Sequence, residues 1–377
     1  MSYEDAFRRS IEQPDACWRG RAEQIHWFAP PRQIHFRDAE GFDRWFRGGK
    51  LNTAYLALDW HVEQGRGDQT ALIYDSPVTQ TKEAYSYEQL LEKVARFAGV
   101  LRQLGVEKSD TVVIFMPLIP ETVVAMLACA RIGAIHSVVF GGFAAHELAI
   151  RIDDARPKGL LTASAGKEMD RVIDYMAIVN EALDESEHPP SKCVVKQREF
   201  YPAQLRADRD SDWDQVSQAA PPVGWVEVDA TDPLYILYTS GTTGRPKGVL
   251  RDNGGHAVAL NFSMSAIYDA KPGEVFWAAS DVGWVVGHSY MVYAPLIHGC
   301  TTLLYEGKPV HTPDAGAFWR VVQYYDVRVM FTAPTAIRAI KREDPQGKLA
   351  KKYDTSSLQY LFLAGERCDT PTLQWSQ

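Results

Sequence analysis

The 377-residue sequence lacks most features that would place it in a membrane, in a secretory pathway or on a structural metal. No run of about 18 uncharged apolar residues is present, because the longest apolar stretch, Pro120 to Ala134, contains Glu121 and Arg131. The five cysteines are scattered and form no Cys-x-x-Cys pair, which argues against a disulfide framework or a zinc site. The N-terminus has no apolar signal-peptide core. We therefore expect a cytoplasmic protein with no membrane partner and no metal-ligand set of its own.

An excess of basic charge is also missing. The chain has 48 acidic and 40 basic residues, a formal net charge of −8, whereas nucleic-acid-binding domains are normally basic. This balance disfavours nucleic acid as a partner but not nucleotides, since one lysine and a few backbone amides suffice to bind a phosphate. The content of 46% hydrophobic and 23% charged residues is typical of globular proteins, and the length suggests two or three domain-sized units.

Two blocks of alternating strand and helix patterns predict an α/β fold with parallel sheets. In the first block, Ser86 and Gln89 form a capping box ahead of an apolar helical stripe that reaches Leu101. The second block begins at Asp232. The strands expected in the two blocks cover residues 111–117, 136–140 and 159–163, and then 235–240, 275–280, 301–307, 327–334 and 358–365.

The segments outside these blocks have weaker patterns. Residues 1–60, rich in Trp, Arg and His, are expected to form an irregular arm with short helices whose aromatic side chains cover another surface. Residues 181–226 are polar and punctuated by proline, which favours a surface connection rather than a core, although CVVKQR within them reads as a strand. The chain stops soon after a buried strand, which suggests a fragment of a longer protein.

The most informative motif is YTSGTTGRPKGV, Tyr238 to Val249, which directly follows an apolar strand. Its glycines allow a tight turn with several N–H groups directed at one point, its hydroxyls add uncharged donors, and Lys247 adds a mobile positive charge. Such a loop suits a polyphosphate. The spacing is not that of a Walker A loop, which disfavours a GTPase or kinase. A flexible Ser/Thr/Gly linker is the simpler alternative.

This motif resembles the signature loop of the adenylate-forming ligases, and other segments resemble their short-chain acyl-CoA synthetase branch. These segments are FGGFAAHELAIRIDDA (140–155), SDVGWVVGHSYMVYAPLIHGCTTLLYEG (280–307), VLRDNGGHAVAL (249–260) and LFLAGERCD (361–369). The last two are most similar to propionyl-CoA synthetases. The resemblance covers essentially the whole chain. It implies an arm of acetyl-CoA synthetase type at residues 1–60 and an AMP-binding large domain at residues 61–377, built of two packed α/β subdomains with mostly parallel sheets.

The resemblance implies an ATP-dependent reaction in which a short-chain carboxylate becomes an acyl-adenylate and is then transferred to CoA, giving acyl-CoA, AMP and pyrophosphate. ATP, Mg²⁺ and CoA are the implied cofactors and co-substrates, and propionate is the favoured acid. The β- and γ-phosphates would be held by the motif loop, with Thr239 and Lys247 in catalytic roles. The other implied residues are Ser240, Gly241, Thr242, Thr243, Gly244, Gly365, Glu366 and Arg367 for ATP, Phe140, Gly141, Gly142 and Arg171 for CoA, and Trp284, Val285, Val286, Gly287 and Ala364 for the acyl pocket.

Several of these assignments have a structural alternative. Gly365 and Glu366 fit a plain strand-to-helix turn, the valines fit core packing, and Arg171 fits a solvated surface position. We expect His288 to be a packed core residue. The sequence also departs from the resembled pattern, because Glu168 stands where the first member of a basic CoA-binding pair is expected.

Ala364 bears on the choice of acid. Relatives that prefer acetate commonly carry Val there, and the smaller Ala would leave room for about one methylene, worth roughly 0.8 kcal/mol. We therefore expect propionate to be preferred over acetate.

The resemblance implies further elements downstream: a magnesium-binding segment, a ribose-binding Asp, an Arg-containing hinge, a closing barrel and a small domain with the adenylation lysine. None of these is found in the 377 residues, so we expect the isolated chain to bind nucleotide without turnover. The alternatives are an acetate– or acetoacetate–CoA ligase and a catalytically silent nucleotide-binding module. The oligomeric state is open.

Overall fold

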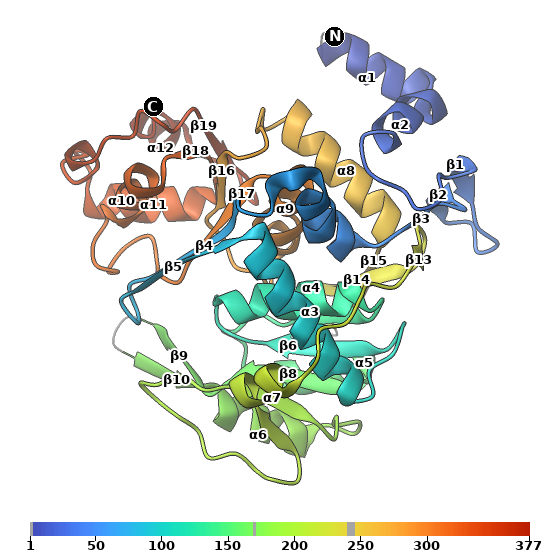
Figure 1. The fold of residues 1–377 in the computed structure, drawn as a ribbon. Coiled ribbons are helices and arrows are strands. Elements are labelled where there is room, and N and C mark those ends of the chain that lie inside the picture. Colours follow the sequence, from blue (N-terminus) through green and yellow to red (C-terminus); the bar gives the residue numbers. More distant parts are fainter. Residues whose placement is uncertain (1–2, 169–170, 240–245) are drawn as a thin grey trace.

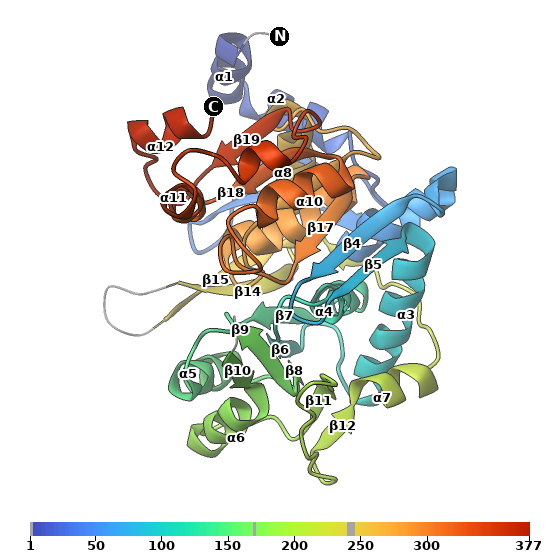
Figure 2. The ribbon, with the colours of Figure 1, turned by 90° about the vertical axis from the view of Figure 1, so that its left-hand side faces the viewer.

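Two mostly parallel sheets make up the centre of the molecule in the computed structural model, which describes residues 3–168, 171–239 and 246–377 (Figures 1 and 2). The first sheet has the order β12-β11-β8-β6-β7-β14-β15, and only the last pair is antiparallel. Its strands are β12 (Asp210–Asp212), β11 (Cys193–Lys196), β8 (Gly159–Ala163), β6 (Thr111–Phe115), β7 (Ile135–Val138), β14 (Pro233–Thr239) and β15 (Lys247–Asp252).

The second sheet has the order β19-β18-β16-β17-β4-β5, again parallel except for the last pair. Its strands are β19 (Tyr360–Leu363), β18 (Val327–Thr332), β16 (Val275–Ala278), β17 (Thr301–Tyr305), β4 (Thr70–Ser76) and β5 (Thr81–Ser86). The expected α/β class with mostly parallel sheets is therefore confirmed. Strand β17 pairs with β4, which precedes the first sheet in the chain, so the second sheet is built from segments on both sides of the first sheet in the sequence.

Helices cover both faces of each sheet because the strands alternate apolar side chains between faces. In β6, Val112 and Ile114 belong to the core under α3 (Tyr87–Gln103) and α4 (Pro120–Arg131), while Val113 and Phe115 pack under α5 (Ala145–Ala155) and α6 (Tyr175–Glu185). The second sheet packs against α10 (Ala317–Tyr325) and α11 (Pro334–Glu343) on one face. Apart from the two helices of the N-terminal arm, the other helices of the described residues are α7 (Trp213–Ala219), α8 (Asn253–Ala266), α9 (Ala294–His298), α12 (Thr370–Trp375), the π-helices η1 (Tyr55–Asp59), η2 (Val62–Arg66) and η3 (Gly287–Tyr293), and the 3₁₀-helix η4 (Ala350–Lys352).

The start of α3 follows the sequence prediction closely. The side chain of Ser86 accepts a hydrogen bond from the backbone N–H of Gln89, and the Gln89 side chain accepts one from the backbone N–H of Ser86. This capping box satisfies two N–H groups that would otherwise lack partners at the helix end. Local sequence alone is enough to fix this boundary.

The N-terminal arm departs from its prediction. After α1 (Tyr3–Glu12) and α2 (Pro14–Ala22), the chain forms a two-stranded antiparallel hairpin, β1 (Gln33–Arg37) with β2 (Asp43–Arg47), and then the short strand β3 (Lys50–Leu51), which pairs with β13 (Val228–Asp229). The expectation of short helices and irregular structure is wrong for residues 33–51. Asp38 stabilises the hairpin turn by accepting hydrogen bonds from the backbone N–H groups of Glu40 and Phe42. The arm's aromatics do cover another surface, as expected: Trp18 contacts Phe262 of α8 edge-on.

Residues 181–226 also differ from the expected surface connection. Strand β11 within them is largely buried and lies inside the first sheet. Trp213 of α7 is 4% exposed and stacks on Phe97 of α3 at 3.7 Å between ring centroids. The polar residues around Trp213 favour a loop in the sequence. In the structure one of them, Asp212, is the N-cap of α7 and accepts a hydrogen bond from the backbone N–H of Gln215.

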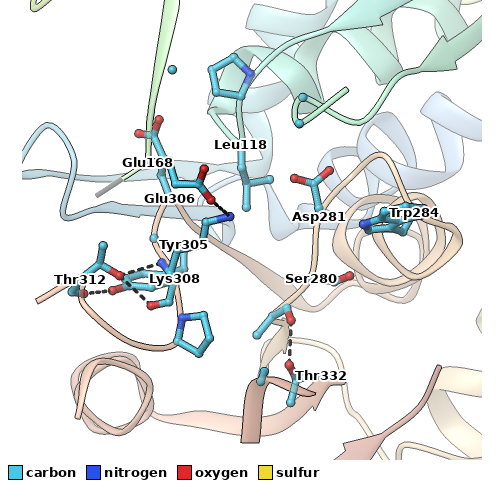
Figure 3. A pocket seen from close by; sticks show the side chains of 18 of the residues that line it. Leu118, Glu168, Ser280, Asp281, Trp284, Tyr305, Glu306, Lys308, Thr312 and Thr332 are labelled. Atoms are coloured by element: carbon cyan, nitrogen blue, oxygen red, sulfur yellow. Dashed lines mark hydrogen bonds and ion pairs between the residues drawn. The ribbon is translucent and has the colours of Figure 1, made fainter. Parts of the chain in front are cut away.

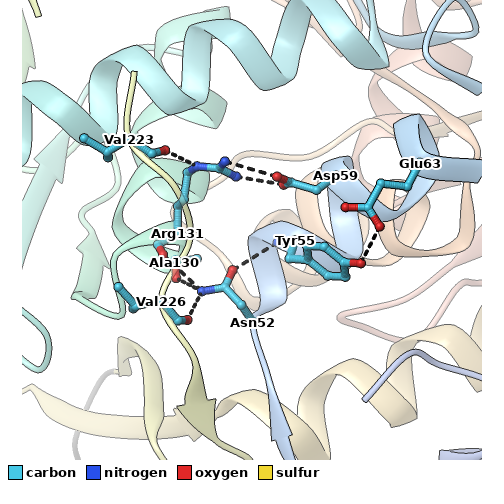
Figure 4. A network of polar contacts seen from close by, with 8 residues as sticks. All are labelled: Asn52, Tyr55, Asp59, Glu63, Ala130, Arg131, Val223 and Val226. Atoms are coloured by element: carbon cyan, nitrogen blue, oxygen red, sulfur yellow. Dashed lines mark hydrogen bonds and ion pairs between the residues drawn. The ribbon is translucent and has the colours of Figure 1, made fainter. Parts of the chain in front are cut away.

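A buried polar network joins η1 to α4 (Figure 4). Arg131 makes a bidentate ion pair with Asp59, with Nη1–Oδ2 and Nη2–Oδ1 distances of 2.7 and 3.1 Å, and its Nε donates to the carbonyl of Val223 at 2.8 Å. The side-chain amide of Asn52 donates to the carbonyls of Ala130, Arg131 and Val226. These contacts join three segments that are far apart in the sequence.

No helix of the described ranges has both the length and the apolar character needed to cross a membrane.

Candidate active site

A cavity of about 670 Å³ lies where the two sheets meet (Figure 3). The segments that line it follow the carboxyl ends of parallel strands in both sheets: Pro117 and Leu118 after β6, Phe140 after β7, Ala279 to Asp281 after β16, Glu306 to Pro309 after β17, and Ala333 after β18. In open α/β sheets, ligands bind in crevices at these strand ends. The volume is in the range of small-molecule and cofactor sites.

The cavity brings together two groups of residues that the sequence analysis assigned to different substrates. Phe140, Gly141 and Gly142, assigned to CoA, line it together with Trp284 from the expected acyl pocket. The rings of Phe140 and Trp284 are 5.1 Å apart. Glycine is needed in the turn because a Cβ atom at Gly141 would lie 2.1 Å from the hydroxyl oxygen of Tyr175. A larger residue at Gly141 would therefore displace Tyr175, which also lines the cavity.

The segment Trp284 to Gly287 combines exposure and burial. Trp284 and Val285 are 47% and 44% exposed, Val286 is half-buried against the main core, and Gly287 is buried. Core packing, the alternative for the two valines, therefore describes Val286 but not Val285. His288 is fully buried, and its Nδ1–H donates to the Trp284 carbonyl at 3.0 Å, so the expected core role of this histidine is confirmed.

Gly287 carries a strong steric constraint, because a Cβ atom there would lie 2.0 Å from the Asp281 carbonyl oxygen and 2.4 Å from the Val282 Cα. Both are backbone atoms, which cannot move aside as a side chain can. We expect Gly287→Ala to lower the free energy of unfolding by about 1–3 kcal/mol, measured by urea denaturation. The matched control is Gly20→Ala in α2, which has open space around its Cβ position and is expected to be neutral or slightly stabilising. Equal stability of the two variants would contradict the steric constraint at Gly287.

Buried charges beside the cavity were not found from the sequence. Glu306 accepts hydrogen bonds through Oε2 from Ser76 at 2.7 Å and from Tyr74, and it pairs with Arg198 Nη2 at 2.9 Å. The side chains of Arg198 and Glu306 are 6% and 7% exposed, and the two residues follow strands of different sheets, β11 and β17. On the other side of the cavity, desolvation raises the pKa of the Asp281 carboxyl. The available signal was the position of Glu306 directly after an apolar parallel strand.

The expected phosphate-binding loop lies only in part within the described residues. Thr239 and Lys247 are register partners at the ends of β14 and β15, both exposed, and the Thr239 hydroxyl donates to the Lys247 carbonyl at 3.5 Å. Lys247 begins the edge strand β15, which continues to Asp252. The sites expected at Ser240, Gly241, Thr242, Thr243 and Gly244 lie outside the described residues. Thr239 and Lys247 are not among the residues that line the cavity.

Ala364 to Arg367 form an exposed turn between β19 and α12. Gly365 has φ +97°, a conformation that favours glycine. Glu366 accepts from the Thr335 hydroxyl and pairs with Arg338 Nη2 at 2.5 Å; both contacts hold the pKa of Glu366 below its usual value. Thr335 lines the cavity, whereas Ala364 to Arg367 do not. This segment therefore borders the cavity through Thr335 and also fits the strand-to-helix turn that we kept as an alternative.

Arg171 lies on β10 (Arg171–Asp174), which forms a hairpin with β9 (Ala165–Glu168). It is exposed and is the register partner of Glu168, which lines the cavity while Arg171 does not. Of the sequence-assigned residues, the cavity thus gathers Phe140, Gly141, Gly142 and Trp284. Within the part of the chain that the structure describes, no group of three or more His, Cys, Asp or Glu side chains is arranged to hold a metal ion.

The arrangement of a cavity at the strand ends of two α/β layers agrees with comparisons to known proteins. Residues 58–377 match the family described as AMP-binding enzyme, and residues 3–57 match the acetyl-coenzyme A synthetase N-terminus. The chain therefore belongs to the AMP-binding enzyme family.

Individual relatives are longer than this chain. It is 52% identical over 376 residues to the mitochondrial acyl-CoA synthetase short-chain family member 3 of Rattus norvegicus, covering all of this chain and 55% of that protein. It is 44% identical over 380 residues to the propionate–CoA ligase of Salmonella typhimurium, covering all of this chain and 59% of that protein. Among solved structures, the acetoacetyl-CoA synthetase from Streptomyces lividans matches with a TM-score of 0.89 at 26% identity, over all of this chain and 57% of that one.

Proposed function

We propose that this chain takes part in the ATP-dependent activation of a short-chain carboxylate and its transfer to CoA, as an acid–thiol ligase of the AMP-forming type. The observation that carries the proposal is the cavity at the strand ends, in which the Phe140–Gly142 turn and Trp284 meet. Membership of the AMP-binding enzyme family and similarity to short-chain acyl-CoA synthetases along the whole chain support it. The domain division at residue 60 remains part of this proposal.

In the proposed reaction the carboxylate attacks the α-phosphate of ATP and pyrophosphate leaves, and the thiol of CoA then attacks the acyl carbon and displaces AMP. The chain's own contribution is to position the reactants and exclude water. Trp284 and Val285 offer an exposed apolar surface for the acyl chain, and the glycine turn lets the backbone approach the thiol substrate closely. Thr239 and Lys247 would contact the phosphate tail, and Mg²⁺ would neutralise part of its charge. Gly365 to Arg367 would lie against the nucleoside.

Propionate is the acid that we propose, with acetate or acetoacetate as alternatives. The similarity to a propionate–CoA ligase over the whole chain favours propionate, whereas the likeness to an acetoacetyl-CoA synthetase keeps acetoacetate in the comparison. Ala364, offered as the source of extra room, is exposed and outside the cavity lining, so the preference for propionate is not tied to that residue alone.

Calorimetric titration of the 377-residue chain tests this proposal directly. We expect binding of ATP, CoA and a non-hydrolysable propionyl-adenylate mimic, with the propionyl mimic bound about fourfold more tightly than the acetyl mimic, the value of one buried methylene. Trp284→Ala should weaken binding of the propionyl mimic, and Tyr324→Ala, an exposed aromatic outside the cavity, should not.

Turnover is followed in parallel as acid-dependent release of pyrophosphate, because the chain spans less than three fifths of these relatives. Binding of the mimics without release is the result expected for the isolated chain, whereas binding of ATP without binding of either acyl mimic would favour a silent nucleotide-binding module. Absence of binding by ATP, CoA and both mimics would contradict the proposed function.

A further inference from the structure

An ion pair at the edge of the cavity joins two segments that are far apart in the sequence. The ammonium group of Lys308, in the segment that follows β17, lies 3.0 Å from Oε1 of Glu168 at the end of β9. Both residues line the cavity, and Figure 3 shows them on the same side as Glu306. The pair therefore connects the β9–β10 hairpin to the second sheet.

This ion pair differs in kind from the buried pair beside it. The side chains of Lys308 and Glu168 are 51% and 44% exposed, whereas those of Arg198 and Glu306 are 6% and 7% exposed. Exposed pairs contribute about 0–1 kcal/mol and are easily opened, while breaking a buried pair is costly. Arg198 is thus committed to Glu306, and Lys308 is a cation that a ligand can recruit at little cost.

The backbone around Lys308 is held firmly although its side chain is exposed. The N–H of Lys308 donates to the hydroxyl oxygen of Thr312 at 2.7 Å, and the same hydroxyl donates to the Lys308 carbonyl at 2.7 Å. The two hydrogen bonds to Thr312 therefore fix the backbone position of Lys308, and its flexible side chain can adjust to reach a ligand in the cavity. A lysine ammonium is a compact point charge with rotatable donors, which suits contact with a phosphate oxygen.

The presence of a carboxylate at position 168 indicates which ligand Lys308 would bind. The resembled family pattern places a basic residue there, next to the glycine turn, and a carboxylate cannot replace it as an anion ligand. The structure instead puts the Lys308 ammonium group directly on that carboxylate. Lys308, which follows β17 of the second sheet, thus supplies the positive charge that position 168 lacks.

We propose that Lys308 is the phosphate-binding cation of the CoA site and that Glu168 holds it at the cavity edge until a CoA phosphate displaces the carboxylate. This assignment rests on the proposed function, and it adds a specificity-determining residue outside all the segments assigned from the sequence. The ligand class is a phosphorylated thiol. The contact can be made by the ribose phosphate or by the diphosphate of CoA, and ligands that lack one or both groups separate these two sources.

The experiment titrates the 377-residue chain with CoA, dephospho-CoA and pantetheine. Lys308→Ala is expected to weaken CoA binding about tenfold or more, as for loss of a charge-assisted hydrogen bond, and to leave pantetheine binding unchanged. If the ribose phosphate is the contact, the variant loses the preference for CoA over dephospho-CoA; if the diphosphate is the contact, both ligands weaken equally. Lys192→Ala, an exposed lysine that does not line the cavity, is the matched control.

A charge exchange supplies the second measurement. Lys308→Glu should weaken CoA binding more than Lys308→Ala, and the double variant Glu168→Lys/Lys308→Glu should regain most of it, because the cation is then restored from the β9–β10 hairpin. A structural ion pair without a ligand role would instead change the melting temperature and leave the affinity for CoA unchanged.

The outcomes separate the two proposals. If the unaltered chain binds neither CoA nor ATP, the proposed function and the Lys308 assignment fall together. If it binds CoA and Lys308→Ala binds CoA equally well, or if pantetheine binding falls as much as CoA binding, only the Lys308 assignment is overturned.

Discussion

Replacing Asp59 by alanine is expected to lower the free energy of unfolding by about 3–5 kcal/mol. The substitution removes one partner of the bidentate pair with Arg131 and leaves the guanidinium buried, since Arg131 is only 5% exposed. The remaining hydrogen bond from Arg131 Nε to the Val223 carbonyl cannot compensate for an unpaired charge. Urea denaturation at neutral pH measures this loss.

The same network provides the control for Asp59→Ala. Glu63 also carries a carboxylate in this network, accepting from the Tyr55 hydroxyl at 2.7 Å, but Glu63 is exposed. Its replacement by alanine should cost about 1 kcal/mol, the net value of one hydrogen bond, because no charged group is left buried without a partner. A similar loss in both variants would show that burial of the Asp59–Arg131 pair does not determine its contribution.

The protein is expected to lose stability steeply between pH 6.5 and pH 4, because it buries neutral histidines. Burial lowers the pKa of His256 to about 3, and that of His61 and His288 to about 4. In the unfolded chain these groups titrate near 6.5, so on acidification the unfolded state takes up protons that the folded state does not. At pH 5 each such histidine costs about 2 kcal/mol, a large part of a typical domain's stability.

Urea midpoints measured at pH 7.5 and pH 5.0 test this sign and size. Burial raises the pKa of Asp252 and Asp281, which opposes the trend, but histidines dominate the upper part of this pH range. His256→Gln should reduce the loss on acidification by about 2 kcal/mol, whereas His146→Gln, whose side chain is 73% exposed, should leave it unchanged. A midpoint independent of pH over this range would contradict the buried neutral state.

The parts of the fold that the sequence predicted are those governed by local chemistry. The capping box at Ser86 specifies its helix end through contacts within four residues, and the apolar strands of both sheets are bounded by glycine or proline. Strand β15 was missed because its residues Lys247 to Leu250 are all exposed at a sheet edge, so they show no alternation of burial. The β1–β2 hairpin was missed because arginines occupy its exposed positions beside the aromatics.

The candidate site was less predictable for a different reason. Motif resemblance found Phe140 to Gly142 and Trp284, which line the cavity. It could not find Glu306 with Arg198, or Lys308 with Glu168, because each pair joins segments more than a hundred residues apart. Which cation meets which carboxylate depends on how the two sheets are packed, and periodicity within one segment carries no information about that.

The pairing of β4 with β17 has a consequence for how the chain is made. Leu72 of β4 lies opposite Thr302 of β17, and β4 is almost entirely buried in the finished sheet. A ribosome adding about 5–20 residues per second completes β17 on the order of ten seconds or more after β4 has been synthesised. During vectorial synthesis the nascent β4–β5 hairpin has one edge of β4 unpaired until β17 is made, so we expect this segment to need chaperone protection.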